Sequence, residues 1–490
     1  MKGILSLRAQ RQLDLVELLM NNEFVTLTIA SEQLNSPIKT IKTDIVELEM
    51  LLAPAKITFS KKEGICLKSP LNFCKSKIYQ KFIQNSIEFQ MIEKVFLKNF
   101  DKVEDLAEDL YISLSTVKRF AQRINQFLQI EGFTINLKKM QLIGDSHSIC
   151  NFMKVYFYEK YGVAENFLSS VELTIIDQII VQIIQKSCPS KKVSNLDFSL
   201  LNSLRFYTYS AINLLKNDSR NLFQITHNQK FELWKDTYFC DEFYSQFNLP
   251  LSLNNLHNIS YLFFSDNYAE SIDAIYRESE RDRHMYLKYQ KIKTLVHHIE
   301  KKAEGKSIDF DEIILRLYNL DSQIHGRTFV LYDKNKEFYN GIINLYGHFP
   351  ERIIHSLQGI YYLSPHKEYL VYEAIFTILT QWPGLLECLE RSKPTVKAAL
   401  LFNSEMEYMD VLCERINYNL KGHLSCIPIE ITSINELEKL VDKFDCIITN
   451  IPDIYIKDIP VVLVPSVPDA KSFAKMMLVY EHHFSEKQRN

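Results

Sequence analysis

Side chains that donate hydrogen bonds cluster between residues 115 and 123 of this 490-residue chain. They are Ser115, Thr116, Lys118, Arg119, Gln122 and Arg123. Ammonium and guanidinium groups suit phosphate oxygens, while hydroxyl, amide and guanidinium groups also suit the edges of bases. With Val117 turned toward a core, we expect these donors to face outward, as the reading face of a recognition helix requires.

The surrounding residues supply the elements that would position this face. Apolar side chains recur at helical spacing on both sides of residues 111–113, which predicts two short helices joined by a turn, a helix-turn-helix. Ser113 or Ser115 can cap the second helix. Two alternating runs, 133–137 and 140–143, then predict a β-hairpin with Lys138 and Lys139 at its tip. The unit is therefore a winged helix-turn-helix.

Residues 34–43 align with residues 110–119 without a gap, so the unit occurs twice. The candidate DNA contacts of the first copy are Lys39, Thr40, Lys42 and Thr43 on the helix, with Lys61 and Lys62 on the wing. That lysine pair stands at nearly the same offset from its helix as Lys138 and Lys139 do from theirs. A single copy is also compatible with an ordinary helical hairpin that carries solvated lysines. Two copies with equally placed basic hairpins favour a pair of DNA-binding units.

The remaining chain indicates a multidomain, mainly α protein. Only 12 Gly and 14 Pro, against 31 Phe and 26 Tyr, favour helices. We predict winged units at 1–70 and 71–164, with linking helices in the second, and two helical-bundle domains at 165–280 and 281–392. From 393 to 490, short apolar runs alternate with helical stretches, which predicts a small α/β domain with a mostly parallel sheet.

Composition excludes several other classes. The nine cysteines are odd in number and form no CxxC, so no zinc site or disulfide framework is expected. We find no nucleotide-binding, zinc-protease or serine-hydrolase motif, and predict no catalytic residue, metal or cofactor. The N-terminus is interrupted by charge and no apolar run is long enough to span a membrane, so we expect a cytoplasmic protein without membrane contact. Net charge is −3, but residues 1–145 hold 20 Lys and Arg against 17 Asp and Glu.

The residues LAEDLYISLSTVKRFAQRIN, the following LKKMQLIGD and the domain order resemble the Mga/AtxA family of Gram-positive virulence regulators. The resemblance implies a transcription activator that binds double-stranded DNA in promoter regions as a homodimer, with RNA polymerase as its activation partner. It further implies that the helical domains are like phosphotransferase-system regulation domains (PRD). The C-terminal domain would be like an enzyme IIB (EIIB) and would carry the dimer contact.

The chain departs from that family at the expected phosphate-accepting positions. These fall near Ser203, Phe264 and Tyr318, where no histidine stands. Among the histidines elsewhere in the helical domains, His355 and His366 are the candidate phosphorylation sites, because they lie near the breaks of the second domain. The first strand of the α/β domain is followed by Asn403 and Ser404 rather than a cysteine. The alternative functions are a phosphocarrier or a protein-binding scaffold of the phosphotransferase system. The apolar face of helix 470–484 would pack in the core or contribute to a dimer contact.

Overall fold

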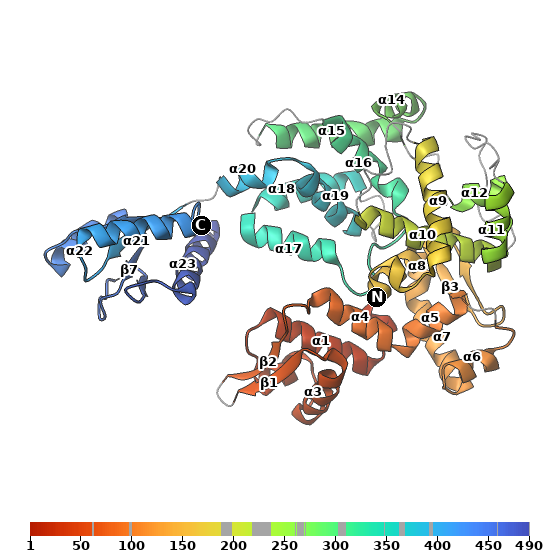
Figure 1. Cartoon of the computed structure of the whole chain (residues 1–490), viewed down its shortest axis with the longest axis horizontal. Helices are drawn as coiled ribbons and strands as arrows, with labels where there is room; N and C mark the ends of the chain where they lie inside the picture. Colours follow the sequence, from red (N-terminus) through yellow and green to blue (C-terminus); the bar gives the residue numbers. More distant parts are fainter. Residues whose placement is uncertain are drawn as a thin grey trace. The chain divides into compact units, whose positions relative to one another are not determined.

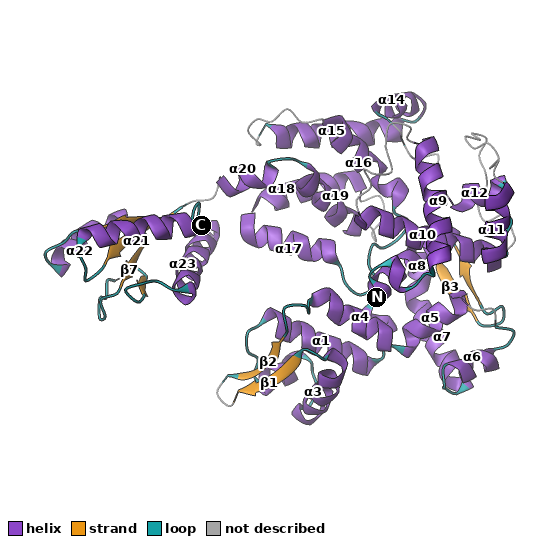
Figure 2. Cartoon of the chain, in the orientation of Figure 1, coloured by secondary structure: helices purple, strands orange, loops and turns teal. Residues whose placement is uncertain are grey.

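The computed structural model describes residues 1–60, 63–97, 100–187, 198–217, 237–259, 261, 269, 271–301, 310–346, 348–361, 368–391, 395–457 and 459–489. Helices predominate, as Figure 2 shows. The chain divides into two compact units. The first comprises Met1–Ile292, Ile314–Glu337 and Gln358–Ala374, and the second comprises Lys293–Ile313, Phe338–Leu357 and Ile375–Asn490.

The first winged unit contains three helices and a hairpin, drawn in red in Figure 1: α1 (Leu7–Asn21), α2 (Leu27–Gln33), α3 (Ile38–Leu52), β1 (Lys56–Ser60) and β2 (Gly64–Lys68). The two strands pair antiparallel from Lys56 opposite Lys68 to Ser60 opposite Gly64. Ile41, Ile45 and Leu48 of α3 are buried at helical spacing. The predicted helix-turn-helix and hairpin of the first copy are therefore both present.

The second winged unit repeats this order with α5 (Ile87–Leu97), α6 (Val103–Asp109), α7 (Leu114–Leu128), β3 (Phe133–Asn136) and β4 (Gln141–Gly144). The Ser113 hydroxyl accepts a hydrogen bond from the Thr116 N–H at 3.2 Å, which caps α7 as expected. Val117 is fully buried, and β3 pairs antiparallel with β4. The helix-turn-helix, its cap and its wing are thus confirmed as structural predictions.

The turns of the two copies share one hydrogen-bond pattern. In the first copy the N–H groups of residues 34, 35 and 36 donate to the carbonyls of Ala30, Glu32 and Ser31. The same three bonds recur in the second copy, from residues 110, 111 and 112 to 106, 108 and 107. Asn35 and Tyr111, at equivalent positions, both have positive φ, 46° and 55°. The duplication therefore extends from sequence to backbone geometry.

Tyr111 gives a direct test of this turn. Its side chain is 96% exposed, so substitution removes little packing. A left-handed conformation costs most non-glycine residues about 1–2 kcal/mol, and asparagine tolerates it better. Tyr111→Asn is therefore expected to raise the free energy of local opening of α6 and α7 by about 1 kcal/mol, measured by amide hydrogen exchange. Tyr111→Ala, which keeps the strain, is the control, and equal protection in the two variants would contradict the prediction.

Further helices join and follow the winged units. They are α4 (Lys75–Asn85), α8 (Ser146–Tyr161), α9 (Ser170–Ser187), α10 (Phe198–Asn217), α11 (Thr237–Phe247), α12 (Leu253–Ile259), α14 (Ile272–Arg281), α15 (Arg283–Glu300), α16 (Phe310–Gln323), α17 (Lys334–Tyr346), α18 (His348–Tyr361), α19 (Glu368–Gln381) and α20 (Leu385–Arg391). The division between the compact units passes through α15 to α19. The bounds of the five predicted domains stay predictions.

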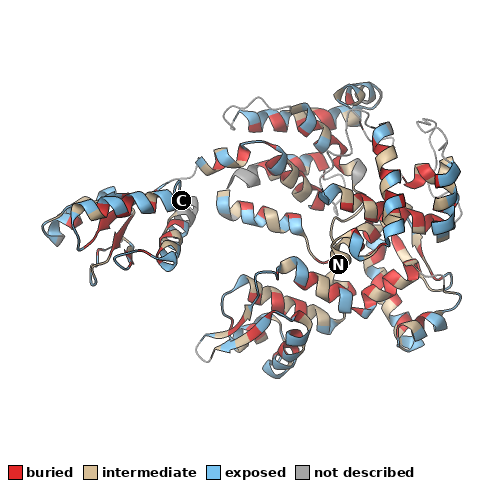
Figure 3. Cartoon of the chain, viewed as in Figure 1, coloured by how far each residue is buried: buried red, intermediate tan, exposed pale blue. Residues whose placement is uncertain are grey.

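The C-terminal α/β fold lies in the second compact unit. Its strands β5 (Val396–Leu401), β6 (Leu424–Pro428), β7 (Cys446–Thr449) and β8 (Val461–Leu463) form one parallel sheet in the order β6-β5-β7-β8. Figure 3 shows this sheet largely buried, as expected for parallel strands with helices on both faces.

Three helices complete this α/β fold: α21 (Met406–Asn419), α22 (Ile434–Leu440) and α23 (Ala470–Arg489). Side chains of α21 and α23 pack on one face of the sheet, and Leu437 of α22 packs on the other. Met476 and Tyr480 are buried in the first of these cores, so that face of α23 packs internally. The predicted parallel α/β arrangement is confirmed.

In the described ranges, no helix is both long and apolar enough to cross a membrane. The same residues contain no group of three or more His, Cys, Asp or Glu arranged to hold a metal ion.

Candidate nucleic-acid interface

The outward face of α7 carries most of the predicted donors of the second copy. Ser115, Lys118, Arg119 and Gln122 are exposed, and Thr116 is half-buried beside the helix cap. Within the described part of the chain, Lys118 and Arg119 form no ion pair. Their charges are therefore available to a polyanion in solution.

The equivalent face of α3 carries the donors of the first copy. Lys39, Lys42 and Thr43 are exposed, and Thr40 is half-buried. The Thr43 hydroxyl donates to the Lys39 carbonyl at 3.1 Å, so its proton is already used within the helix. The two exposed ammonium groups on this side of the helix have the chemistry that suits phosphate oxygens.

The wings differ in how far the structure describes them. Lys138 and Lys139 are exposed at the tip of the β3–β4 hairpin, and both their backbone N–H groups donate to Asn136 Oδ1 at 3.0 Å. This side-chain acceptor stabilises the turn that carries the two exposed lysines. Lys61 and Lys62 lie outside the described residues, although the strands on either side of them pair as expected.

Arg123 corrects one sequence expectation, because its guanidinium turns inward rather than outward. It forms an ion pair with Glu88 of α5, whose side chain is only 6% exposed, and its Nη2 donates to the Ile4 carbonyl at 3.1 Å. An arginine held by a buried carboxylate and a main-chain carbonyl anchors α7 rather than reading DNA. We therefore treat Arg123 as a positioning residue.

In the first copy, a hydrogen-bonded pair of different residues lies at the positions equivalent to Arg123 and Glu88. When the alignment of the two copies is extended, Gln12 of α1 falls on Glu88 and Glu47 of α3 falls on Arg123. Gln12 Nε2 donates to Glu47 Oε2 at 2.7 Å, and Glu47 also pairs with Arg8. The sequence therefore carries a signal for this inward orientation, because the extended alignment places Arg123 on an acid.

This equivalence gives a charge-exchange test. Arg123→Glu places two carboxylates together at a largely buried position, and should lower the free energy of opening of α7 by about 2–3 kcal/mol. Adding Glu88→Gln recreates the pair found in the first copy and should recover most of that loss, as seen by hydrogen exchange. If the double variant is no more stable than Arg123→Glu alone, the two anchors are not equivalent.

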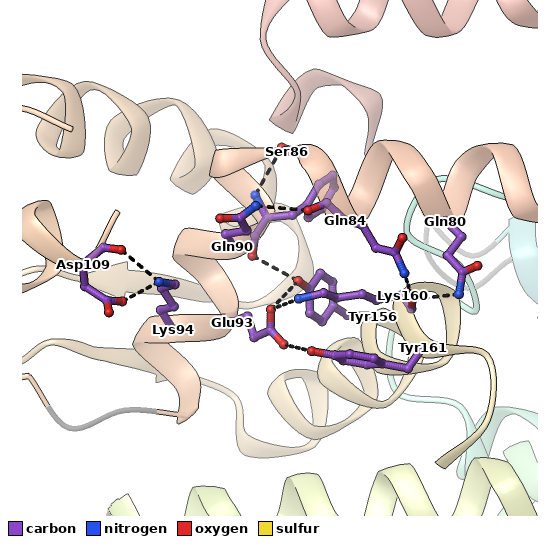
Figure 4. Close-up of polar contacts among 11 residues, drawn as sticks. Gln80, Gln84, Ser86, Gln90, Glu93, Lys94, Asp109, Tyr156, Lys160 and Tyr161 are labelled. Atoms are coloured by element: carbon purple, nitrogen blue, oxygen red, sulfur yellow. Dashed lines mark hydrogen bonds and ion pairs between the residues drawn. The ribbon is translucent and has the colours of Figure 1, made fainter. Parts of the chain in front are cut away.

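A second group of polar contacts holds α5 against its neighbours, as Figure 4 shows. The Glu93 carboxylate accepts hydrogen bonds from the hydroxyls of Tyr156 at 3.0 Å and Tyr161 at 2.6 Å, and pairs with Lys160. Burial raises the pKa of both tyrosines, and the adjacent carboxylate raises it further. Next to it, Lys94 pairs with Asp109 of α6 at 2.6 Å. Helix α5 thus joins the helix-turn-helix to α8.

The connection between α16 and α17 is bound to the second winged unit. Backbone N–H groups of residues 330–332 donate to the Glu159 carboxylate of α8 at 2.6, 2.9 and 3.3 Å. Burial raises the pKa of Glu159 to about 7, and these backbone donors oppose the shift. Arg327 Nε donates to Glu131 at 2.7 Å, just before the wing. Sequence inspection missed these contacts because the partners lie far apart in the chain.

The candidate phosphorylation sites are described only in part. His355 is exposed on α18, and His366 lies outside the described residues. Cys413, Cys426 and Cys446 are buried in the C-terminal α/β fold, with the sulfurs of Cys413 and Cys426 3.2 Å apart. Burial raises the pKa of Cys446 to about 12, which keeps that thiol protonated.

Comparison with known proteins agrees with this geometry. Residues 71–157 match the Mga helix-turn-helix domain. The chain is 24% identical to the anthrax toxin expression trans-acting positive regulator of Bacillus anthracis, over 92% of this chain and 94% of that protein. It is 22% identical to a provisionally named trans-acting regulator of Streptococcus pneumoniae, over 92% and 93% of the two chains. The capsule synthesis positive regulator AcpA of Bacillus anthracis is 27% identical over 34% of this chain and 36% of its own.

The fold, the matching domain and the names of the similar proteins together define a transcription regulator with a helix-turn-helix domain. The chain therefore carries a Mga helix-turn-helix domain at residues 71–157 and is similar over most of its length to proteins named as trans-acting regulators.

Proposed function

We propose that this protein binds double-stranded DNA in promoter regions through its two winged units and activates transcription. The observation that carries the proposal is the duplicated outward face: Lys118 and Arg119 on α7, and Lys42 at the equivalent place on α3, all exposed. Lysine and arginine at these positions suit phosphates, and arginine also suits the edge of guanine. Thr116, Gln122, Thr40 and Thr43 are the other candidate base readers. Lys138 and Lys139 suit the flanking backbone.

The proposed active form is a homodimer that contacts itself through the C-terminal α/β fold. Four winged units would then cover a long site, where DNA bending contributes to recognition besides base contacts. RNA polymerase is the proposed activation partner, since the positive regulators that resemble this chain are named for raising expression. Both partnerships rest on the family resemblance.

A genome-wide footprint of the full chain tests the proposal. We expect protected segments upstream of genes, each longer than a single winged unit could cover and arranged with the two-fold symmetry of a dimer. We also expect the chain to be retained on duplex DNA at low salt, and the affinity to fall steeply as the salt concentration rises. A protein-binding scaffold predicts no retention even at low salt, and that result would reject DNA binding.

Control by the sugar phosphotransferase system forms the second part of the proposal. The exposed imidazole of His355 is one candidate acceptor, and His366 is the other. Incubating the chain with the general phosphocarrier and labelled phosphoenolpyruvate distinguishes the outcomes. Label on either histidine supports control of a regulator by phosphate, label on a cysteine supports a phosphocarrier, and an unlabelled chain argues against both.

A further inference from the structure

The two recognition helices are equal in length and register but differ in the chemistry they expose. Helix α3 spans Ile38–Leu52 and α7 spans Leu114–Leu128, so each position of one has an equivalent position in the other. On α7, one line of exposed side chains along the helix consists of Arg119, Gln122 and Gln126. The matching row of α3 reads Thr43, Val46 and Met50.

Helix α3 exposes apolar side chains in this row. Val46 is 58% exposed and Met50 is 72% exposed, one helical turn apart and therefore on the same side of the helix. Lys39 and Lys42 are exposed at the amino-terminal end of the same helix. This face therefore presents apolar side chains on the same helix as two cations, a combination that suits an apolar group bordered by negative charge.

Duplex DNA offers that combination in the major groove, where the thymine C5-methyl is an apolar group on the base edge and phosphates border the groove. Arginine and glutamine, which occupy the matching positions of α7, instead pair with guanine and adenine through hydrogen bonds. We infer that α3 selects thymine by methyl contact with Val46 and Met50, whereas α7 reads purines by hydrogen bonding. This inference rests on the proposed DNA binding and assigns each helix a different half of the site.

The consequence is a site with two unlike parts for each chain, in spite of the duplication. One part should require thymine at positions where no hydrogen bond is made, and the other should require purines. Thr43 fits this division, because its hydroxyl proton is already bound by the Lys39 carbonyl.

The test uses the full chain and a duplex selected by it from a random pool. Each thymine in the protected segment is replaced singly by deoxyuridine, which removes the methyl and leaves the pairing edge intact. At the positions under α3 we expect affinity to fall about fourfold for each methyl lost. With Val46→Ala, the same replacement should have no further effect at the position that Val46 contacts.

Gln122→Ala is the matched control, since it alters the equivalent position of α7 and should leave the uracil effect under α3 unchanged. Uracil replacements that are all neutral, or equally harmful to Val46→Ala and to the unaltered chain, would overturn the inference and indicate a protein partner for this face. Failure to select any duplex would instead refute DNA binding itself, and the inference with it. Val46 is exposed, so its truncation should not prevent folding.

Discussion

Replacing Lys118 and Arg119 together by alanine is expected to lower affinity for the selected duplex by roughly a hundredfold or more. An arginine that pairs with a base contributes about 1–3 kcal/mol, and each lost phosphate contact flattens the dependence of log affinity on log salt by about one unit. Both side chains are exposed on α7 and form no ion pair in the described residues, so their removal should leave the fold intact. A mobility-shift titration at several salt concentrations measures both quantities.

The matched control removes two cations elsewhere. Lys421 and Lys443 are exposed in the C-terminal α/β fold, and replacing both by alanine changes the net charge equally. We expect this variant to bind with nearly unaltered affinity and salt dependence. If the two double variants lose the same affinity, the effect comes from total charge and α7 is not the reading helix.

Replacing Glu93 by alanine is expected to lower the free energy of local unfolding of α5 and α8 by about 3–5 kcal/mol. The substitution leaves the ammonium of Lys160, whose side chain is 13% exposed, without its carboxylate, and also removes the acceptor of two tyrosine hydroxyls. A charge left unpaired in a largely buried place costs more than the pair contributed. Amide hydrogen exchange in α5 and α8 measures the loss.

Asp109→Ala is the control, because it removes the carboxylate of the neighbouring but more exposed ion pair between Lys94 and Asp109. Lys94 and Asp109 are each more than a quarter exposed, and Lys94 also donates to the Asp109 backbone carbonyl at 3.0 Å, a bond that alanine keeps. The expected cost is below about 1 kcal/mol. Equal losses in the two variants would show that burial does not distinguish these ion pairs.

Local features were predictable from the sequence. The turn, the Ser113 cap and the β3–β4 hairpin each depend on residues within a few positions of one another, and short-range spacing reveals them. The parallel sheet was predictable for a related reason, since strands covered on both faces appear as continuous apolar runs such as that ending at Leu401.

Contacts between distant residues were not predictable in this way. Arg123 was expected on the outward face because its neighbours are cationic, but Glu88, 35 residues earlier, turns it inward. Glu93 and Lys160 are 67 residues apart, and Glu159 meets residues 330–332, which belong to a much later part of the chain. Periodicity cannot reveal which charged side chains meet after the helices pack, so the anchors of the reading helices emerged only from the three-dimensional structure.

The connection from recognition helix to wing is the place where the two copies stop matching. Residues 53–55 separate α3 from β1, and residues 129–132 separate α7 from β3, so the second connection is longer by one position. Before it the turns and helices align without a gap, and after it the hairpin tips align only when this extra position is skipped. In the proposed DNA complex, a longer loop would change how far the lysine-bearing hairpin reaches along the duplex, while the exposed face of the helix stays the same. The length of this connection and the side chains that the helix exposes can therefore vary independently of each other.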